Sequence, residues 1–245
     1  MKIYIGFDDT DNLDADRGTG KLARWFEREL PDHCYLEGVL RQQLLVHEDI
    51  PYTSHNSSAC VVVNAPDVSF AEELTNRAVK HVEQYMLEGS DPGICVACNG
   101  NGGMERLMQF GRECTSRVVT QGEAMDAASG YHLSGHGGTN DGIIGAAAAV
   151  GLTASGWSGR FIEFGRLRNF SEVIAVSELE RSNIRVVSID RDANVPALND
   201  LVYTKGWLRP RLLGDRAVLI VARKGEGSWE SIGKKRRNGN GKITL

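Results

Sequence analysis

The chain has 245 residues, with 28 Lys and Arg against 32 Asp and Glu, which gives a formal net charge of −4. A hydrophobic content of 41% and a charged content of 24% indicate a globular protein with a full core, and they exclude collagen-like, coiled-coil and largely disordered classes. The pI near 5.9 disfavours a general nucleic-acid coat. No apolar run approaches the length of about 18 residues that a membrane span needs. We therefore expect a cytoplasmic protein without a membrane partner.

The hydrophobic pattern predicts strands that alternate with helices. The predicted strands are 2–7, 36–46, 59–64, 94–97, 172–176, 185–189 and 217–222, and the predicted helices are 19–30, 70–87, 120–129 and 143–152. Glycine-rich segments at 99–103 and 135–142 interrupt this order. The fold class expected from it is α+β or mixed α/β, with a β-α-β unit of right-handed crossover over 59–97.

Three aspartates, Asp8, Asp9 and Asp11, follow directly on the first predicted strand. Carboxylates held so close together repel one another, and a bound cation relieves the repulsion. A ligand set of oxygens alone suits Mg²⁺, with a nucleotide phosphate completing its coordination. We therefore predict a metal site at these residues, one of which could instead orient an attacking hydroxyl. The alternative is an Asp-rich turn without a ligand.

A short segment with glycines and two cations, residues 17–21, opens the first predicted helix. Backbone amides at such a helix start, together with nearby cations, can hold phosphate. The segment is not a Walker A loop, because the first glycine and the Ser or Thr after the lysine are absent. The alternative is an ordinary N-cap at Thr19. The residues in question are Arg17, Gly18, Thr19, Gly20 and Lys21.

Several weaker features each allow two interpretations. The loop 137–142 could form a second phosphate cradle, or it could serve only the close packing of the alanine-rich helix that follows. His55 could be a general base or a surface residue. The pair Cys95 and Cys98 lacks the further ligands of a zinc site at a recognisable spacing, so we expect reduced thiols. The basic tail could contact RNA or be a solvated terminus.

Five segments in chain order carry a family resemblance. They are Ile5-Gly6-Phe7-Asp8-Asp9-Thr10-Asp11-Asn12, Arg17-Gly18-Thr19-Gly20-Lys21-Leu22-Ala23, Ile50-Pro51-Tyr52-Thr53 with Asn56, Asp91-Pro92-Gly93, and Gly142-Ile143-Ile144-Gly145-Ala146-Ala147-Ala148. Together they resemble the amino-terminal kinase-like domain of the archaeal tRNA-isoleucine agmatinylcytidine synthetases. The resemblance covers residues 3–150 and extends more faintly to 222.

The resemblance implies a kinase-like ATP lobe beside a ferredoxin-like lobe. The family hydrolyses ATP to AMP, phosphorylates the wobble cytidine, couples agmatine to it, and autophosphorylates a threonine. Thr19 falls on that threonine, in a loop two residues longer, with Gly20 in place of a second threonine. The resemblance implies catalytic roles for Asp8, Asp9, Asp11 and Thr19. The residues it implies for binding nucleotide are Thr10, Arg17, Gly18, Gly20, Lys21, Asn56, Asn140 and Gly142.

The family continues into an OB-fold and a zinc ribbon, for which this chain has no room, so we expect a short stand-alone relative. The expected domains are a discontinuous nucleotide-binding lobe (1–60 and 130–222), a ferredoxin-like lobe (61–129) and a basic tail (223–245). The expected function is Mg²⁺- and ATP-dependent phosphoryl or nucleotidyl transfer to a small-molecule or RNA acceptor. The alternative is a non-catalytic nucleotide-binding regulator or RNA accessory protein. A homodimer is left open.

Overall fold

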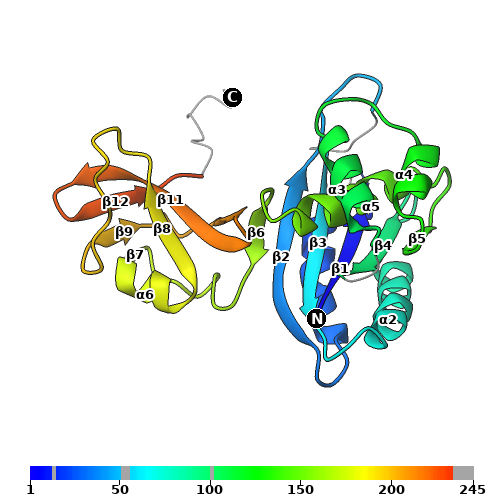
Figure 1. The fold of residues 1–245 in the computed structure, drawn as a ribbon, viewed down its shortest axis with the longest axis horizontal. Coiled ribbons are helices and arrows are strands. Elements are labelled where there is room, and N and C mark those ends of the chain that lie inside the picture. Colours follow the sequence, from blue (N-terminus) through cyan, green and yellow to red (C-terminus); the bar gives the residue numbers. More distant parts are fainter. Residues whose placement is uncertain (13–14, 51–55, 100–101, 234–245) are drawn as a thin grey trace. The chain divides into compact units, whose positions relative to one another are not determined.

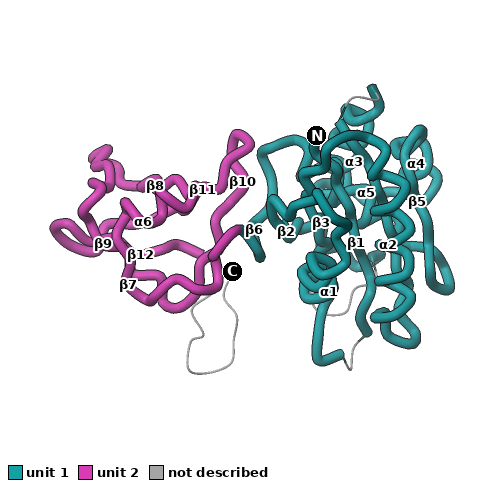
Figure 2. Tube along the Cα trace, turned by 90° about the horizontal axis from the view of Figure 1, so that it is seen from below, with its two compact units in different colours: residues 1–164 teal, residues 165–245 magenta. Residues whose placement is uncertain are grey.

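The computed structural model describes residues 1–12, 15–50, 56–99 and 102–233. It divides into two compact units, Met1–Phe164 and Gly165–Leu245 (Figure 2). Both contain strands and helices, and the predicted mixed α and β fold class is confirmed. None of the described helices has the length and apolar character needed to cross a bilayer.

Unit 1 is built on an antiparallel sheet with the strand order β5-β4-β1-β3-β2-β6 (Figure 1). Its strands are β1 (Lys2–Asp8), β2 (Tyr35–Gln43), β3 (Ser57–Asn64), β4 (Gly93–Cys98), β5 (His132–Gly135) and β6 (Arg160–Glu163). The central strands are buried on both faces, which explains their nearly continuous apolar sequences.

Helices cover both faces of this sheet. The first face carries α1 (Thr19–Trp25), the 3₁₀ turn η1 (Phe26–Glu29) and α2 (Phe70–Tyr85), whose apolar side chains share one core with the strands. The second face carries α5 (Gly142–Ala154), which packs on α3 (Met104–Glu113) and α4 (Gln121–Ala127). Close approach of α5 needs a glycine in β1, because a Cβ on Gly6 would lie 2.1 Å from the carbonyl oxygen of Ala146.

The first six elements follow the order β1-α1-β2-β3-α2-β4, with η1 extending α1. With the sheet order β4-β1-β3-β2, this is the split β-α-β arrangement of ferredoxin-like domains. The boundaries expected from the sequence differ from the observed units. Residues 61–129 do not form a separate lobe, because β3 and β4 both pair with β1 within one sheet. Residues 165–222 belong to unit 2 rather than to the first lobe.

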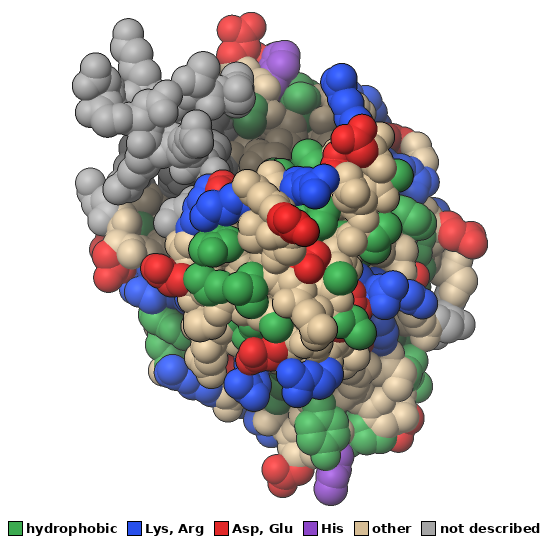
Figure 3. All heavy atoms as spheres, turned by 90° about the vertical axis from the view of Figure 1, so that its left-hand side faces the viewer, with side chains coloured by type: hydrophobic (Ala, Val, Ile, Leu, Met, Phe, Trp, Pro, Cys, Tyr) green, Lys and Arg blue, Asp and Glu red, His purple; other side chains and the backbone are tan. Residues whose placement is uncertain are grey.

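Unit 2 is a smaller α+β body. Its elements are β7 (Val173–Ala175), α6 (Val176–Arg181), β8 (Ile184–Ser188), β9 (Leu201–Tyr203), β10 (Arg211–Leu213), β11 (Arg216–Gly225) and β12 (Ser228–Ser231). Strand β8 runs parallel to β11, and β9 runs parallel to β12. On the face of unit 2 seen in Figure 3, side chains of both charges are interspersed with apolar ones.

The basic tail was expected to begin at residue 223, but regular structure continues beyond that residue. Strand β11 extends to Gly225, and β12 pairs with it. Trp229 in β12 is 4% exposed, and its indole N–H donates to Asp200 Oδ2 at 2.7 Å. A buried aromatic ring explains why this part of the chain packs despite its polar surroundings. The four consecutive cations at 234–237 lie outside the described residues.

Candidate functional site

Asp8, the first of the three aspartates, lies at the end of β1, on the face of the sheet that α5 covers. The carboxylate of Asp8 packs so closely on the helix that a Cβ at Gly145 would lie 1.7 Å from Asp8 Oδ2. Burial raises the pKa of Asp8 to about 8, and the neighbouring carboxylates of Asp9 and Asp11 add to the increase. The charged form of Asp8 therefore needs a positive partner.

The next residue continues the acidic turn. Asp9 has a φ of 48°, in the left-handed region that Asp tolerates better than most residues. Burial raises the pKa of Asp9 to about 6, with further increases from Asp91, Asp11 and Asp141. Burial also raises the pKa of Asp11. Negative charge is thus concentrated at this edge of the sheet.

Asp91, which the sequence analysis named only within the resemblance segment Asp91-Pro92-Gly93, joins the predicted loop 137–142 to the aspartates. Its carboxylate accepts hydrogen bonds from the Thr139 hydroxyl and from the amides of Asn140 and Asp141, the last two at 2.8 Å. Burial alone would raise the pKa of Asp91, but these hydrogen bonds together lower it. The Asp91 amide in turn donates to the Asp9 carbonyl at 3.2 Å.

Asn140 and Gly142 lie beside the acidic turn through Asp91. Gly142 lies against the preceding turn so tightly that a Cβ there would be 2.2 Å from the Asp91 carbonyl oxygen. Sequence analysis missed Asp91 and Asp141 as members of this cluster. No local signal marks Asp91, because its place beside Asp9 depends on the pairing of β4 with β1.

Two threonines connect the acidic turn to the start of α1. The Thr10 hydroxyl donates to Thr19 Oγ1 at 3.1 Å, and the Thr10 amide donates to the same oxygen at 3.3 Å. Both side chains are buried. Gly18, which precedes the helix, faces the turn, because a Cβ there would lie 3.2 Å from Asp11 Oδ2. These contacts unite Thr10, Gly18 and Thr19 with the aspartates.

The other residues predicted to bind phosphate, Arg17, Gly20 and Lys21, make their contacts away from the aspartates. The Arg17 guanidinium donates to the Tyr85 carbonyl at 2.6 Å and lies 5.6 Å from the centroid of the Trp25 ring. Lys21 Nζ lies 5.4 Å from the same centroid. Gly20 faces the sheet, where a Cβ would lie 3.0 Å from Ile162 Cδ1. The cations therefore gather around Trp25, one helical turn or more from Thr19.

Asn56, which was predicted to bind nucleotide, forms hydrogen bonds to the backbone of the neighbouring segment. Its side-chain amide donates to the Leu45 carbonyl at 2.6 Å, and its own carbonyl accepts from the Leu44 amide at 2.9 Å. These bonds join the ends of β2 and β3. The rest of the motif to which Asn56 was assigned, together with His55, lies at 51–55, outside the described residues.

The carboxylate oxygens at the acidic turn suit a hard cation that also binds ligands from outside the protein. Among the described residues, no three His, Cys, Asp or Glu side chains converge into a complete metal cage. Mg²⁺ commonly takes only one or two carboxylates, with waters and phosphates completing the octahedron. In the pairing of β1 with β3, Phe7 lies opposite Ala59, so the next position places Ser58 of β3 opposite Asp8. The Ser58 hydroxyl is buried and has no hydrogen-bond partner. This orphaned oxygen marks a polar position close to the carboxylates.

The cysteines carry no comparable chemistry. Cys95 and Cys98 are buried on β4 and are not joined in a disulfide. Burial raises the pKa of both. Protonated thiols are poor metal ligands and poor nucleophiles.

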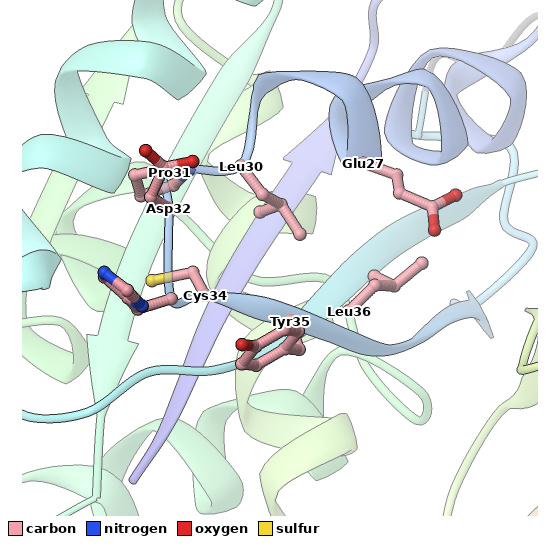
Figure 4. Close-up of a pocket in the computed structure, with 8 residues that line it drawn as sticks. Glu27, Leu30, Pro31, Asp32, Cys34, Tyr35 and Leu36 are labelled. Carbon is pink, nitrogen blue, oxygen red and sulfur yellow. The ribbon is translucent and has the colours of Figure 1, made fainter.

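A separate pocket lies away from the acidic turn. About 530 Å³ in volume, it is formed where η1 leads into β2 and is drawn in Figure 4. Cys34, Tyr35 and Leu36 line it from the strand, and Glu27 and Leu30 from the 3₁₀ turn and its end. We assign it no chemistry, because its ionisable lining residues, Glu27, Asp32 and His33, are all exposed at the surface.

Comparisons with known proteins give structural matches only. No protein-family model matches the chain, and no curated protein matches its sequence. A solved structure described as a tRNA fluorescent labeling enzyme matches with a TM-score of 0.52 and 25% identity, over 62% of this chain and 36% of that one. A complex of TiaS with its tRNA and ATP matches with a TM-score of 0.51 and 24% identity, over 62% and 36%.

These two matches confirm, in fold, the resemblance to the tRNA-isoleucine agmatinylcytidine synthetases inferred from the sequence. The chain is similar to this class of tRNA-modifying protein in fold. It spans about a third of the length of the solved structures that it matches, with 35% or 36% of each covered.

Proposed function

We propose that unit 1 binds Mg²⁺-ATP at the acidic turn and transfers a phosphoryl or nucleotidyl group to an acceptor. The observation that carries the proposal is the concentration of Asp8, Asp9 and Asp11 beside Thr19. Carboxyls with raised pKa values gain most from a divalent cation, which replaces their protons and cancels their repulsion.

The geometry supports the following roles. One or two of the three aspartates hold Mg²⁺, which supplies charge neutralisation to a bound triphosphate. The backbone around Gly18 and the loop with Asn140 and Gly142 border the same turn and offer amides to phosphate oxygens. Thr19 is the proposed phosphoryl acceptor within the chain, by the resemblance described above.

The acceptor outside the chain is the open part of the proposal. The likeness to a tRNA labeling enzyme makes tRNA the first acceptor to test. A small molecule is the second acceptor to test. The products of ATP distinguish phosphoryl transfer from nucleotidyl transfer. Release of ADP indicates the first reaction, and release of pyrophosphate indicates the second.

Burial of the Thr19 hydroxyl, at 6% exposure for the residue, favours one alternative. A protein that binds nucleotide without turnover would keep this hydroxyl bonded to Thr10. Turnover of ATP with any acceptor excludes that alternative.

The test is calorimetry with ATP in the presence of Mg²⁺ or EDTA. Binding is expected to weaken by at least about tenfold with EDTA and in the double variant Asp8→Asn with Asp11→Asn, since a charge-assisted contact is commonly worth more than one decade of affinity. Asp126→Asn is the matched control, because Asp126 is exposed on α4. Equal affinity without metal, or in the double variant, contradicts the site.

A further inference from the structure

A second, smaller cavity lies between the first helical segment and α2. Its lining residues are Trp25, Arg28, Glu29, His81 and Tyr85, and its volume is about 110 Å³. Since a water takes about 30 Å³ in the liquid, this space suits a few waters or one flat ring, and it is too small for a whole nucleotide.

His81 presents a hydrogen-bond acceptor there. Its residue is 2% exposed, and Nε2 lies 3.0 Å from the Leu22 carbonyl oxygen. A carbonyl only accepts, so Nε2 carries the proton. Burial lowers the pKa of His81, which keeps the imidazole neutral and leaves Nδ1 with a lone pair. Nδ1 is buried and has no hydrogen-bond partner.

Glu29 places a second acceptor opposite the first. Its Oε1 lies 3.9 Å from His81 Nδ1. Two acceptors that face each other repel unless a donor group lies between them. An amino group has two N–H bonds, one for each acceptor, and so matches this pair better than a hydroxyl does.

Aromatic rings define the shape of the ligand. Trp25 and Tyr85 meet edge to face with centroids 5.6 Å apart, and the His81 and Tyr85 rings are 4.9 Å apart in the same type of contact. Walls of this kind favour a flat, aromatic group.

The charges around Trp25 decide between a cationic and an anionic ligand. Arg17 and Lys21 approach its ring to 5.6 and 5.4 Å, and Arg28 lines the cavity. These three cations outnumber the two nearby carboxylates, Glu29 and Asp16, the second of which lies 3.8 Å from the Arg17 guanidinium, and the excess disfavours an organic cation such as an alkylamine. They favour a neutral amino-bearing ring attached to an anionic group.

The cavity is connected to the acidic turn through the end of α2. Arg17 bonds the Tyr85 carbonyl at 2.6 Å, and the Leu87 amide donates to the Thr10 carbonyl at 3.3 Å. Tyr85, which lines the cavity, thus lies two residues before Leu87, which bonds the turn where phosphates are proposed to bind.

We infer that this cavity is a base subsite that takes an amino-bearing nucleobase of a nucleotide, with the exocyclic amino group donating one N–H to His81 Nδ1 and the other to the Glu29 carboxylate. The inference rests on the proposed function and names the specificity of that site. A keto oxygen in place of the amino group would face two acceptors, so keto-bearing bases are rejected.

The test compares matched nucleotides that exchange the amino group for a keto oxygen. Binding of ATP, ITP, CTP and UTP in Mg²⁺ is measured by calorimetry on the full chain. ATP is expected to bind about tenfold more tightly than ITP, and CTP about tenfold more tightly than UTP, because the keto members leave buried acceptors unpaired. Equal affinities within both pairs overturn the base subsite while leaving Mg²⁺-dependent binding, and with it the proposed function, intact.

Two variants locate the subsite. His81→Phe keeps an aromatic ring but removes the acceptor, and it is expected to reduce the preference for amino over keto bases to within about twofold. Trp25→Phe is expected to remove most of the fluorescence change on ATP binding, with Trp157→Phe as control, since Trp157 is 70% exposed. An undiminished preference in a folded His81→Phe protein, or an unchanged signal in Trp25→Phe, contradicts the assignment. Absence of any nucleotide binding overturns both proposals.

Discussion

The hydroxyl of Thr10 donates to the hydroxyl oxygen of Thr19 at 3.1 Å, and the Thr10 amide reaches the same oxygen at 3.3 Å. These bonds join the acidic turn after β1 to the first residue of α1. Their effect is to fix the aspartates relative to the Gly18–Thr19 segment before any ligand binds. Pre-arranged groups lose less freedom on binding than mobile ones do, so affinity at this site depends on the contact between the two threonines.

Gly145→Ala in α5 should disturb the position of the Asp8 carboxylate. The added Cβ would lie 1.7 Å from Asp8 Oδ2, so either the carboxylate or α5 must shift. We expect a loss of about 1–3 kcal/mol in the free energy of unfolding, and weaker Mg²⁺-ATP binding. Urea denaturation and calorimetry measure the two effects.

The control for Gly145→Ala is Gly122→Ala in α4. A Cβ there meets only Thr120 Oγ1, at 3.9 Å, so the change should leave stability equal or slightly higher. If both substitutions have the same effect on stability and binding, Asp8 does not depend on close packing by α5.

The raised pKa values predict how stability changes with pH. Asp8 titrates at about 8 and Asp9 at about 6 in the folded protein, against 3.8 as the reference for both. Between these values the folded state binds more protons than the unfolded state, so stability without metal falls as pH rises from about 4 to 8. Each group contributes a slope of at most about 1.4 kcal/mol per pH unit.

Asp8→Asn should remove much of that slope. We expect the variant to unfold at a higher urea concentration than the wild type at pH 8, and the difference to shrink as the pH approaches 5. Added Mg²⁺ should stabilise the wild type at pH 8 more than the variant. Parallel pH profiles for the two proteins would show that Asp8 ionises as an ordinary exposed carboxyl.

Trp229→Ala tests the assignment of residues 223–233 to a folded unit. The ring is 4% exposed and bonds Asp200, so its removal should cost unit 2 about 3–5 kcal/mol. Trp157→Ala changes an exposed ring and should cost much less. Thermal unfolding followed by circular dichroism compares the two. Equal stability of Trp229→Ala and wild type would indicate that β12 contributes nothing to the fold.

Local patterns predicted the elements of unit 1 well. The apolar period of 70–87 matches α2, and the strand expected at 59–64 matches β3 within two residues. The helix expected at 120–129 is α4, which begins with a capping box between Thr120 and Glu123. These elements follow from neighbours in sequence, so sequence alone suffices for them.

Long-range pairing is what the sequence did not reveal. Nothing local in Gly93–Cys98 indicates that it pairs with β1, and that pairing joins the two lobes expected separately. The same limit explains why Asp91 was missed, since its role depends on loop 137–142 folding back onto it. Arg17 and Lys21 were placed at phosphate because charge is visible in a sequence, whereas the position of Trp25 beside them is not.

Autophosphorylation of Thr19 distinguishes an enzyme from a nucleotide-binding protein. Transfer requires the Thr19 oxygen to attack the γ-phosphorus of ATP, with its proton passing to a carboxylate of the acidic turn and ADP leaving. In this structure the oxygen accepts two hydrogen bonds from Thr10, which must loosen before a lone pair is free to attack. Thr10→Val removes the hydroxyl donor, so at saturating ATP, where the lower affinity has no effect, we expect it to be labelled about 3–10-fold faster than wild type.

Intact-mass measurement after incubation with Mg²⁺ and ATP gives the result for wild type, Thr10→Val and Thr19→Ala. A single phosphate on the first two and none on Thr19→Ala is the expected outcome. A phosphate that persists in Thr19→Ala would show that the acceptor is a different residue. Unmodified wild type and Thr10→Val, together with no turnover of ATP on tRNA, would contradict an enzyme and leave the non-catalytic binder, because binding requires the aspartates but no free hydroxyl.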